Sequence, residues 1–99
     1  MPGEAWNARW TVKLIFSDHA WQDYLSWRET DTKTFDRLND LIKEAKRTPF
    51  RGSGKPEPLK GDLTGWWSRR ITKADRLVYR VSGRGDAQVL EIAQCRYHY

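Results

Sequence analysis

The chain has 99 residues, of which 38% are hydrophobic and 31% are charged, a balance typical of one small globular domain rather than a disordered segment. No apolar run approaches the roughly 20 residues that cross a bilayer, and the first ten residues lack the apolar core of a signal peptide, so no membrane association is expected. Cys95 is the single cysteine, which excludes an internal disulfide and predicts a reducing, cytoplasmic location.

The formal net charge of +5 is concentrated in the middle of the chain. Residues 1–42 hold five basic and seven acidic residues, residues 43–80 hold eleven basic and four acidic residues, and residues 81–99 hold two of each. A localised basic field attracts polyanions. The charge therefore indicates a nucleic acid or an acidic protein segment as partner, although a basic surface without any partner has the same composition.

The first half of the chain predicts a strand followed by a helical hairpin. VKLIF (12–16) is a short β-branched, apolar run, and Ser17 after it is a good N-cap. Residues 1–11 show no period, so we treat them as an N-terminal extension of a domain over residues 12–99. Asp31 or Thr32 separates two helices, the second of which ends before Pro49. Helical spacing predicts as core the residues Ala20, Trp21, Tyr24, Leu25, Trp27, Phe35, Leu38, Leu41, Ile42 and Ala45.

The second half predicts a loop over residues 48–58 and three antiparallel strands. The strands are Trp66–Ile71, Arg76–Val81 and Gln88–Cys95, joined by turn-rich segments. The order β-α-α-β-β-β predicts an α+β fold with two N-terminal helices packed on a mostly antiparallel four-stranded sheet. The helices would cover one face, and alternation along the strands predicts arginines on the free face.

The loop contains two motifs, of which only the second predicts a functional residue. GSGK (52–55) is no phosphate-binding loop, because Pro56 follows Lys55 where a helix would have to begin. In KPEPLK (55–60), each proline favours extended backbone in the residue before it, which predicts extended Lys55 and Glu57 in a stiff loop. The Glu57 carboxylate then either neutralises neighbouring cations or acts as a positioned base.

One set of residues suits RNA cleavage by transesterification. The set is Glu57, Lys60, Arg70, Arg76, His98 and Tyr99. An acid/base pair moves the protons of the ribose 2′-hydroxyl and of the leaving 5′-oxygen, and guanidinium groups stabilise the charge on phosphorus. This chemistry needs no metal or other cofactor, and Cys95 with His98 has the spacing of only half a metal site.

Four motifs carry a resemblance that covers residues 12–99. They are DYLSW (23–27), TPFRGSGKPEPLKGDLTGWWSRRI (48–71), RLVY (76–79) and CRYHY (95–99). With them the chain resembles the YoeB toxins of the RelE-type mRNA interferases. The resemblance implies a microbial RNase fold and an endoribonuclease that inhibits translation by cleaving mRNA in the A site of the 70S ribosome. Residues 1–11 and the SGRGDAQ segment (82–88) depart from the family pattern.

The resemblance also implies residue roles and partners. Glu57 matches the family's general base and His98 its general acid, with Arg76 as a catalytic arginine. Lys60, Arg70 and Tyr99 match residues that bind RNA or phosphate. The implied partners are a YefM-like antitoxin, operator DNA only through the antitoxin complex, and a second copy in a homodimer. A competing hypothesis is a binding module that blocks translation without cutting.

Overall fold

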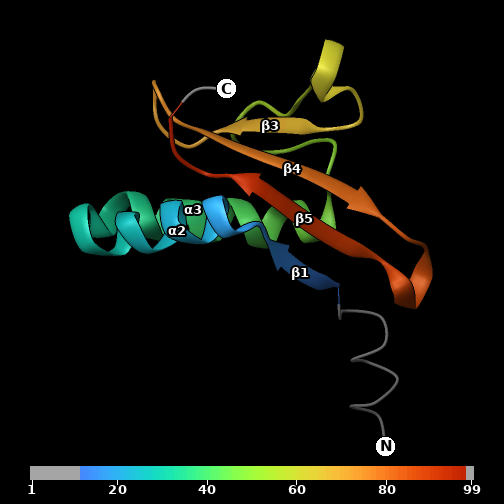
Figure 1. Ribbon diagram of the computed structural model, residues 1–99, viewed down its shortest axis with the longest axis horizontal. Helices are drawn as coiled ribbons and strands as arrows, with labels where there is room; N and C mark the ends of the chain where they lie inside the picture. The colour runs from blue at the N-terminus through green and yellow to red at the C-terminus, as the bar shows by residue number, and fades with distance from the viewer. Residues whose placement is uncertain (1–11, 98–99) are drawn as a thin grey trace, which may run out of the picture.

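The computed structural model describes residues 12–97; residues 1–11, which include the predicted extension, and residues 98–99 lie outside the described part. Figure 1 shows the order of the elements along the chain. The helices and strands are β1 (Lys13–Phe16), α2 (Asp18–Thr30), α3 (Thr32–Arg47), β2 (Glu57–Pro58), β3 (Trp67–Arg70), β4 (Arg76–Ser82) and β5 (Val89–Gln94), with 3₁₀ turns η1 (Gly61–Leu63) and η2 (Gly85–Ala87). The predicted elements are all present, with boundaries shifted by one residue or so.

The strands form one sheet in the order β1-β5-β4-β3-β2. β1 runs parallel to β5, and the other three pairs are antiparallel. The predicted α+β class is confirmed, but the predicted count of four strands is wrong by one. Glu57 and Pro58 pair with β3 as a two-residue edge strand. Proline is tolerated there because one side of an edge strand needs no N–H donors.

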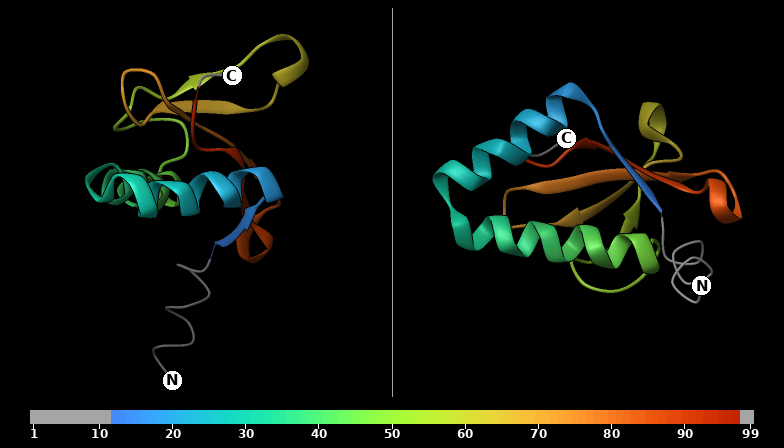
Figure 2. Two further views of the ribbon diagram at one scale, coloured as in Figure 1. Left: turned by 60° about the vertical axis from the view of Figure 1, so that its left-hand side comes forward. Right: turned by 90° about the horizontal axis from the view of Figure 1, so that it is seen from below.

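Both helices lie on the same face of the sheet (Figures 1 and 2). The Ser17 hydroxyl accepts a hydrogen bond from the Ala20 N–H at 3.0 Å, and Asp31 caps α3 by accepting one from the Thr34 N–H at 3.0 Å. Their shared core contains Ala20, Trp27, Leu38, Leu41, Ile42, Ala45, Ile71, Leu77, Tyr79, Leu90, Ile92 and Cys95. Trp21 was predicted to be in this core, yet it is 45% exposed and stacks on Tyr24 at the edge of the hairpin.

The end of β5 is fixed to α2 by buried hydrogen bonds. The Trp27 indole donates to the Cys95 carbonyl at 2.7 Å, and the Cys95 N–H donates to the Asp23 carboxylate at 3.0 Å. All three residues are buried. Because unpaired buried polar groups are costly, these bonds hold the chain in one place where it leaves the sheet. Among residues 12–97, no helix has the length and apolar character needed to cross a membrane.

The buried thiol gives a direct test of this packing. Burial, together with the nearby Asp23 carboxylate, raises the pKa of Cys95 to about 12. Since the thiolate is the reactive form, we expect Cys95 in the folded protein to resist Ellman's reagent at about pH 8 and to react fully after unfolding in guanidinium. The absorbance of the released thionitrobenzoate measures both. Rapid modification of the folded protein would contradict the packing of β5 against α2.

Candidate active site

The strand register places three of the predicted site residues on the sheet face away from the helices. Glu57 lies opposite Ser68, and Ser68 lies opposite Val78. Arg70, two residues after Ser68 on β3, lies opposite Arg76, two residues before Val78 on β4. Residues directly opposite each other, and residues two apart in one strand, share a face. Glu57, Arg70 and Arg76 therefore lie on one face of three neighbouring strands, which we call the open face.

Glu57 presents an accessible carboxylate at the edge of the open face. Its side chain is 52% exposed, and its Oε1 lies 3.9 Å from the Lys55 Nζ. A long, exposed ion pair of this kind contributes little energy and leaves the carboxylate available to a ligand. The prediction that Lys55 is extended is wrong: its φ of +54° is left-handed, so the chain bends there before it enters β2.

The loop before β2 is organised by Arg69, whose side chain is fully buried. Its guanidinium donates to the Thr48 carbonyl at 2.6 Å, to the Arg51 and Ser53 carbonyls at 3.0 Å, and to the Tyr79 hydroxyl at 3.0 Å. This role of Arg69 was not predicted from the sequence. The available signal was strand alternation, which puts Arg69 on the apolar face with Trp67 and Ile71 and so requires a buried arginine with several partners.

Glu44 fastens the same loop from α3. Its Oε1 accepts a hydrogen bond from the Ser53 N–H at 2.6 Å and lies 3.4 Å from the Arg69 Nη1. A Cβ on Gly52, whose φ is +117°, would stand 1.7 Å from this oxygen. Close packing against Glu44 thus explains the glycine at position 52 of GSGK.

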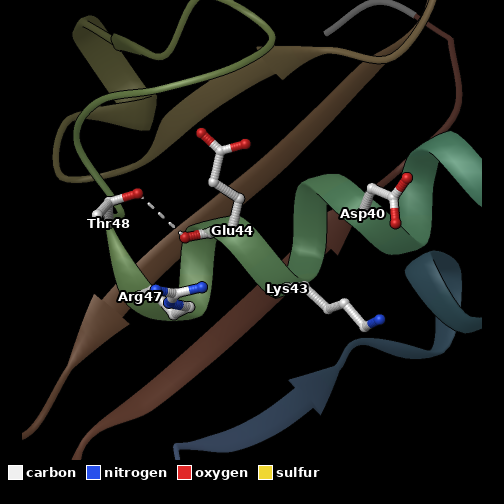
Figure 3. Close-up of a pocket in the computed structure, with 5 residues that line it drawn as sticks. All are labelled: Asp40, Lys43, Glu44, Arg47 and Thr48. Atoms are coloured by element: carbon white, nitrogen blue, oxygen red, sulfur yellow. Dashed lines mark hydrogen bonds between the residues drawn. The ribbon is translucent and has the colours of Figure 1, made fainter.

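A pocket on α3 lies apart from the open face. It is lined by Asp40, Lys43, Glu44, Arg47 and Thr48, and Figure 3 shows the Glu44 side chain pointing toward the loop that follows Thr48. The helices cover the opposite face of the sheet from Glu57, so this pocket belongs to the support of the loop rather than to the candidate active site.

Arg76 is held at the beginning of β4 together with the C-terminal segment. Its Nη1 donates to the carbonyls of Thr72, Lys73 and Asp75, each at 3.1 Å. The backbone N–H of Arg76 donates to the Tyr97 carbonyl at 3.0 Å. The chain thus returns to Arg76 just before its last two residues. His98 and Tyr99 lie outside the described residues, so their predicted places in the site stay predictions.

The remaining polar groups of the site are divided between exposed and paired residues. Lys60 is exposed and immediately precedes η1. On β4, Arg80 pairs with Glu91 at 2.9 Å and stacks over the Trp66 ring at 4.3 Å from its centroid. The hydrogen bond from Arg80 holds the pKa of Glu91 below its usual value. Glu91 therefore compensates one of the arginines on this face.

Two helices on one face of a small, mostly antiparallel sheet, with arginines and the accessible Glu57 carboxylate on the other, define a compact α+β protein with a basic surface. The family model described as the YoeB-like toxin of a bacterial type II toxin–antitoxin system matches residues 16–99. The chain belongs to this family.

Relatives and solved structures agree with this assignment. The toxin YoeB of Escherichia coli is 57% identical over 88 residues, covering 89% of this chain and all of the relative. The structure of a YoeB/ParE toxin from Agrobacterium tumefaciens superposes with a TM-score of 0.87 at 58% identity, covering 89% of this chain and all of that one. Two Staphylococcus aureus structures are also similar: a YoeB dimer (TM-score 0.79, 42% identity, 89% and 98% coverage) and a YoeB–YefM complex (0.77, 39%, 90% and 99%).

Replacing the buried guanidinium tests its role in the loop. Arg69→Met should lower the free energy of unfolding by about 3 kcal/mol, because several carbonyls lose their buried donor. Arg51→Met is the matched control, since Arg51 is exposed and contributes its carbonyl rather than its side chain. Urea denaturation measures both variants. Equal stability of the two variants would contradict the role of Arg69.

The pairing of Glu44 predicts a pH dependence of stability. The hydrogen bond from the Ser53 N–H lowers the pKa of Glu44 from its ordinary value of 4.5. A lowered pKa in the folded state contributes stability that is present above the unfolded pKa and is lost as the pH falls through the folded pKa. Between about pH 6 and 3, Glu44→Gln should therefore lose less stability than the wild type in urea denaturation. The exposed control Glu29→Gln should follow the wild-type curve.

Proposed function

We propose that this toxin is a ribosome-dependent endoribonuclease that cleaves mRNA in the ribosomal A site by metal-independent acid/base transesterification. The observation that carries the proposal is the register of β2, β3 and β4, which puts Glu57, Arg70 and Arg76 on one face. A carboxylate on the same sheet face as two guanidinium groups supplies a proton acceptor and phosphate ligands to one surface.

The proposed reaction assigns one proton transfer to each of two residues. Glu57 accepts the proton of the ribose 2′-hydroxyl, and the 2′-oxygen attacks phosphorus. The bond from phosphorus to the 5′-oxygen breaks while His98 donates a proton to that oxygen. The products are a 2′,3′-cyclic phosphate and a 5′-hydroxyl, so no water or metal enters the balance. A histidine suits the second role because its ordinary pKa of about 6.5 allows proton donation near neutral pH.

The cations have two tasks in this proposal. Arg76, fixed by three carbonyls, stabilises the charge that develops on the phosphorane, because a cation already in place needs no reorganisation. Arg70 and Lys60 are exposed and bind the RNA backbone on either side, with Tyr99 as a further contact. This division is supported by the different anchoring of the two arginines.

The proposed partners follow from the same surface. A YefM-like antitoxin with an acidic, partly disordered segment would fold over the basic open face and cover Arg70 and Arg76, or displace the C-terminal tail. The similarity to the S. aureus YoeB–YefM complex supports such a partner. Operator DNA would then be bound through the antitoxin. The similarity to the S. aureus YoeB dimer supports pairing of two copies.

Primer extension on a defined mRNA tests the reaction against simple blockage of the ribosome. Wild-type protein should produce cuts inside the A-site codon only when ribosomes are present. Glu57→Gln and His98→Gln should each lower the cleavage rate about 10²-fold or more, because each removes one proton transfer. Saturating antitoxin should suppress the cuts.

Matched controls separate catalysis from general damage. Glu29→Gln and His19→Gln make the same chemical changes at exposed positions on α2, and both should cleave like the wild type. Arrested ribosomes with uncut mRNA in the wild-type sample would establish a binding inhibitor and overturn the proposed enzyme. Full cleavage in the presence of saturating antitoxin would rule out the proposed covering of the site.

A further inference from the structure

We propose that Asp75 is a positioning residue for cleavage, which fixes Tyr97, the residue before the proposed proton donor, against the beginning of β4. The proposal rests on the proposed function, because it gives Asp75 a purpose in placing the proton donor. Asp75 lies in the turn between β3 and β4, outside every role that the family resemblance implied. Its carboxylate joins this turn to the other end of the chain.

The contact has two components that meet at Tyr97. The Asp75 Oδ1 accepts a hydrogen bond from the Tyr97 N–H at 2.6 Å. The Tyr97 carbonyl accepts one from the Arg76 N–H at 3.0 Å. Both backbone groups of Tyr97 are therefore bound to two consecutive residues, and its φ of +63° turns the chain at that point. These contacts fix both the position of Tyr97 and the direction in which the chain leaves it.

The segment that leads to Tyr97 is already held by α2. The Arg96 guanidinium donates to the Ser26 hydroxyl at 2.7 Å and stacks over the Trp27 ring at 4.0 Å from its centroid. Cys95 is bound by Asp23 and Trp27. The two bonds of Tyr97, to Asp75 and to Arg76, continue this series, so loss of the Asp75 carboxylate would leave Tyr97 held by the Arg76 N–H alone while the preceding residues stay in place.

The turn itself does not depend on the bond to Tyr97. Asp75 closes the turn through its backbone carbonyl, which accepts from the Ile71 N–H at 2.9 Å, and through Oδ2, which accepts from the Thr72 hydroxyl at 2.7 Å. Arg76 adds bonds to the turn's carbonyls. One oxygen of the carboxylate thus serves the turn, while the other serves the tail, which separates the two roles experimentally.

The consequence for cleavage follows from chain connectivity. The position of Tyr97 limits the reach of the residue that follows it, because neighbouring Cα atoms are about 3.8 Å apart. Tyr97 is itself bonded to Arg76, which lies opposite Arg70 in the sheet. In this proposal, holding Tyr97 at two points limits the positions open to the proton donor, whereas loss of one of the two bonds widens that range and lowers the rate.

A double-mutant cycle in ribosome-dependent primer extension tests the proposal with the full-length protein. Asp75→Ala should lower kcat at least about tenfold with KM for programmed ribosomes unchanged. Asp75→Asn should restore most of the rate, because its amide oxygen can still accept from the Tyr97 N–H. Thr72→Val removes the Oδ2 contact together with the acceptor of the Ala74 and Asp75 N–H groups, but it leaves the bond of Oδ1 to Tyr97, so it should cost less than Asp75→Ala. The control Asp86→Ala removes the same charge in η2, at the other end of β4.

Measuring Asp75→Ala in a protein that also carries His98→Gln distinguishes a positioning role from loss of folded protein. If Asp75 acts through the tail, adding Asp75→Ala to His98→Gln should change the residual rate by less than about twofold. An equal loss in both backgrounds would show a structural role and overturn the proposal, as would wild-type cleavage by Asp75→Ala. Glu57→Gln is measured in parallel. Cleavage by the wild type and not by Glu57→Gln would keep the proposed function even if the role of Asp75 fails; absence of wild-type cleavage would overturn both.

Discussion

The buried guanidinium of Arg69 is the interaction on which the open face depends. It holds three carbonyls of the loop between α3 and β2, while Glu44 on α3 neutralises its charge and binds the same loop. A buried cation is stable only when its donors are matched in this way. Because the loop is fixed at several points, the short strand β2 that follows it can pair with β3 in one register. The position of Glu57 on the open face therefore depends on Arg69, whose side chain lies on the opposite face of the sheet.

Strand alternation gives neighbouring arginines opposite tasks. Arg69 points into the protein and organises a loop, whereas Arg70, one residue later, is exposed on the open face. Likewise the prolines around Glu57 suit an edge strand, where missing N–H groups leave no partner unsatisfied. The same two residues stop further strands from adding to this edge. The edge therefore remains accessible beside the carboxylate.

Local sequence patterns were sufficient for both helices, for four of the five strands and for the arginines of the open face. The caps Ser17 and Asp31, and the period-two arginines of β4, are decided by bonds and geometry within a few residues. The features that could not be predicted depend on contacts between distant segments. The left-handed Lys55, the pairing of Glu57 with β3 and the exposed side of Trp21 all follow from how the loop and the hairpin dock. The contact of Asp75 with Tyr97 joins residues 22 positions apart, and no local pattern indicates it.

The formal net charge overstates the number of basic side chains that are available to bind a polyanion on the open face. Among the basic residues of positions 43–80, Arg69 is neutralised inside the protein by Glu44 and Arg80 is paired with Glu91. Arg76 differs, because within residues 12–97 the partners of its guanidinium are neutral carbonyls that orient it without cancelling its charge. An oriented and uncompensated cation is what stabilises charge that develops during a reaction, since it requires no rearrangement. The exposed Arg70 opposite it is better suited to first contact with a phosphate. The arrangement of partners, rather than the number of arginines, thus separates a residue for chemistry from a residue for binding.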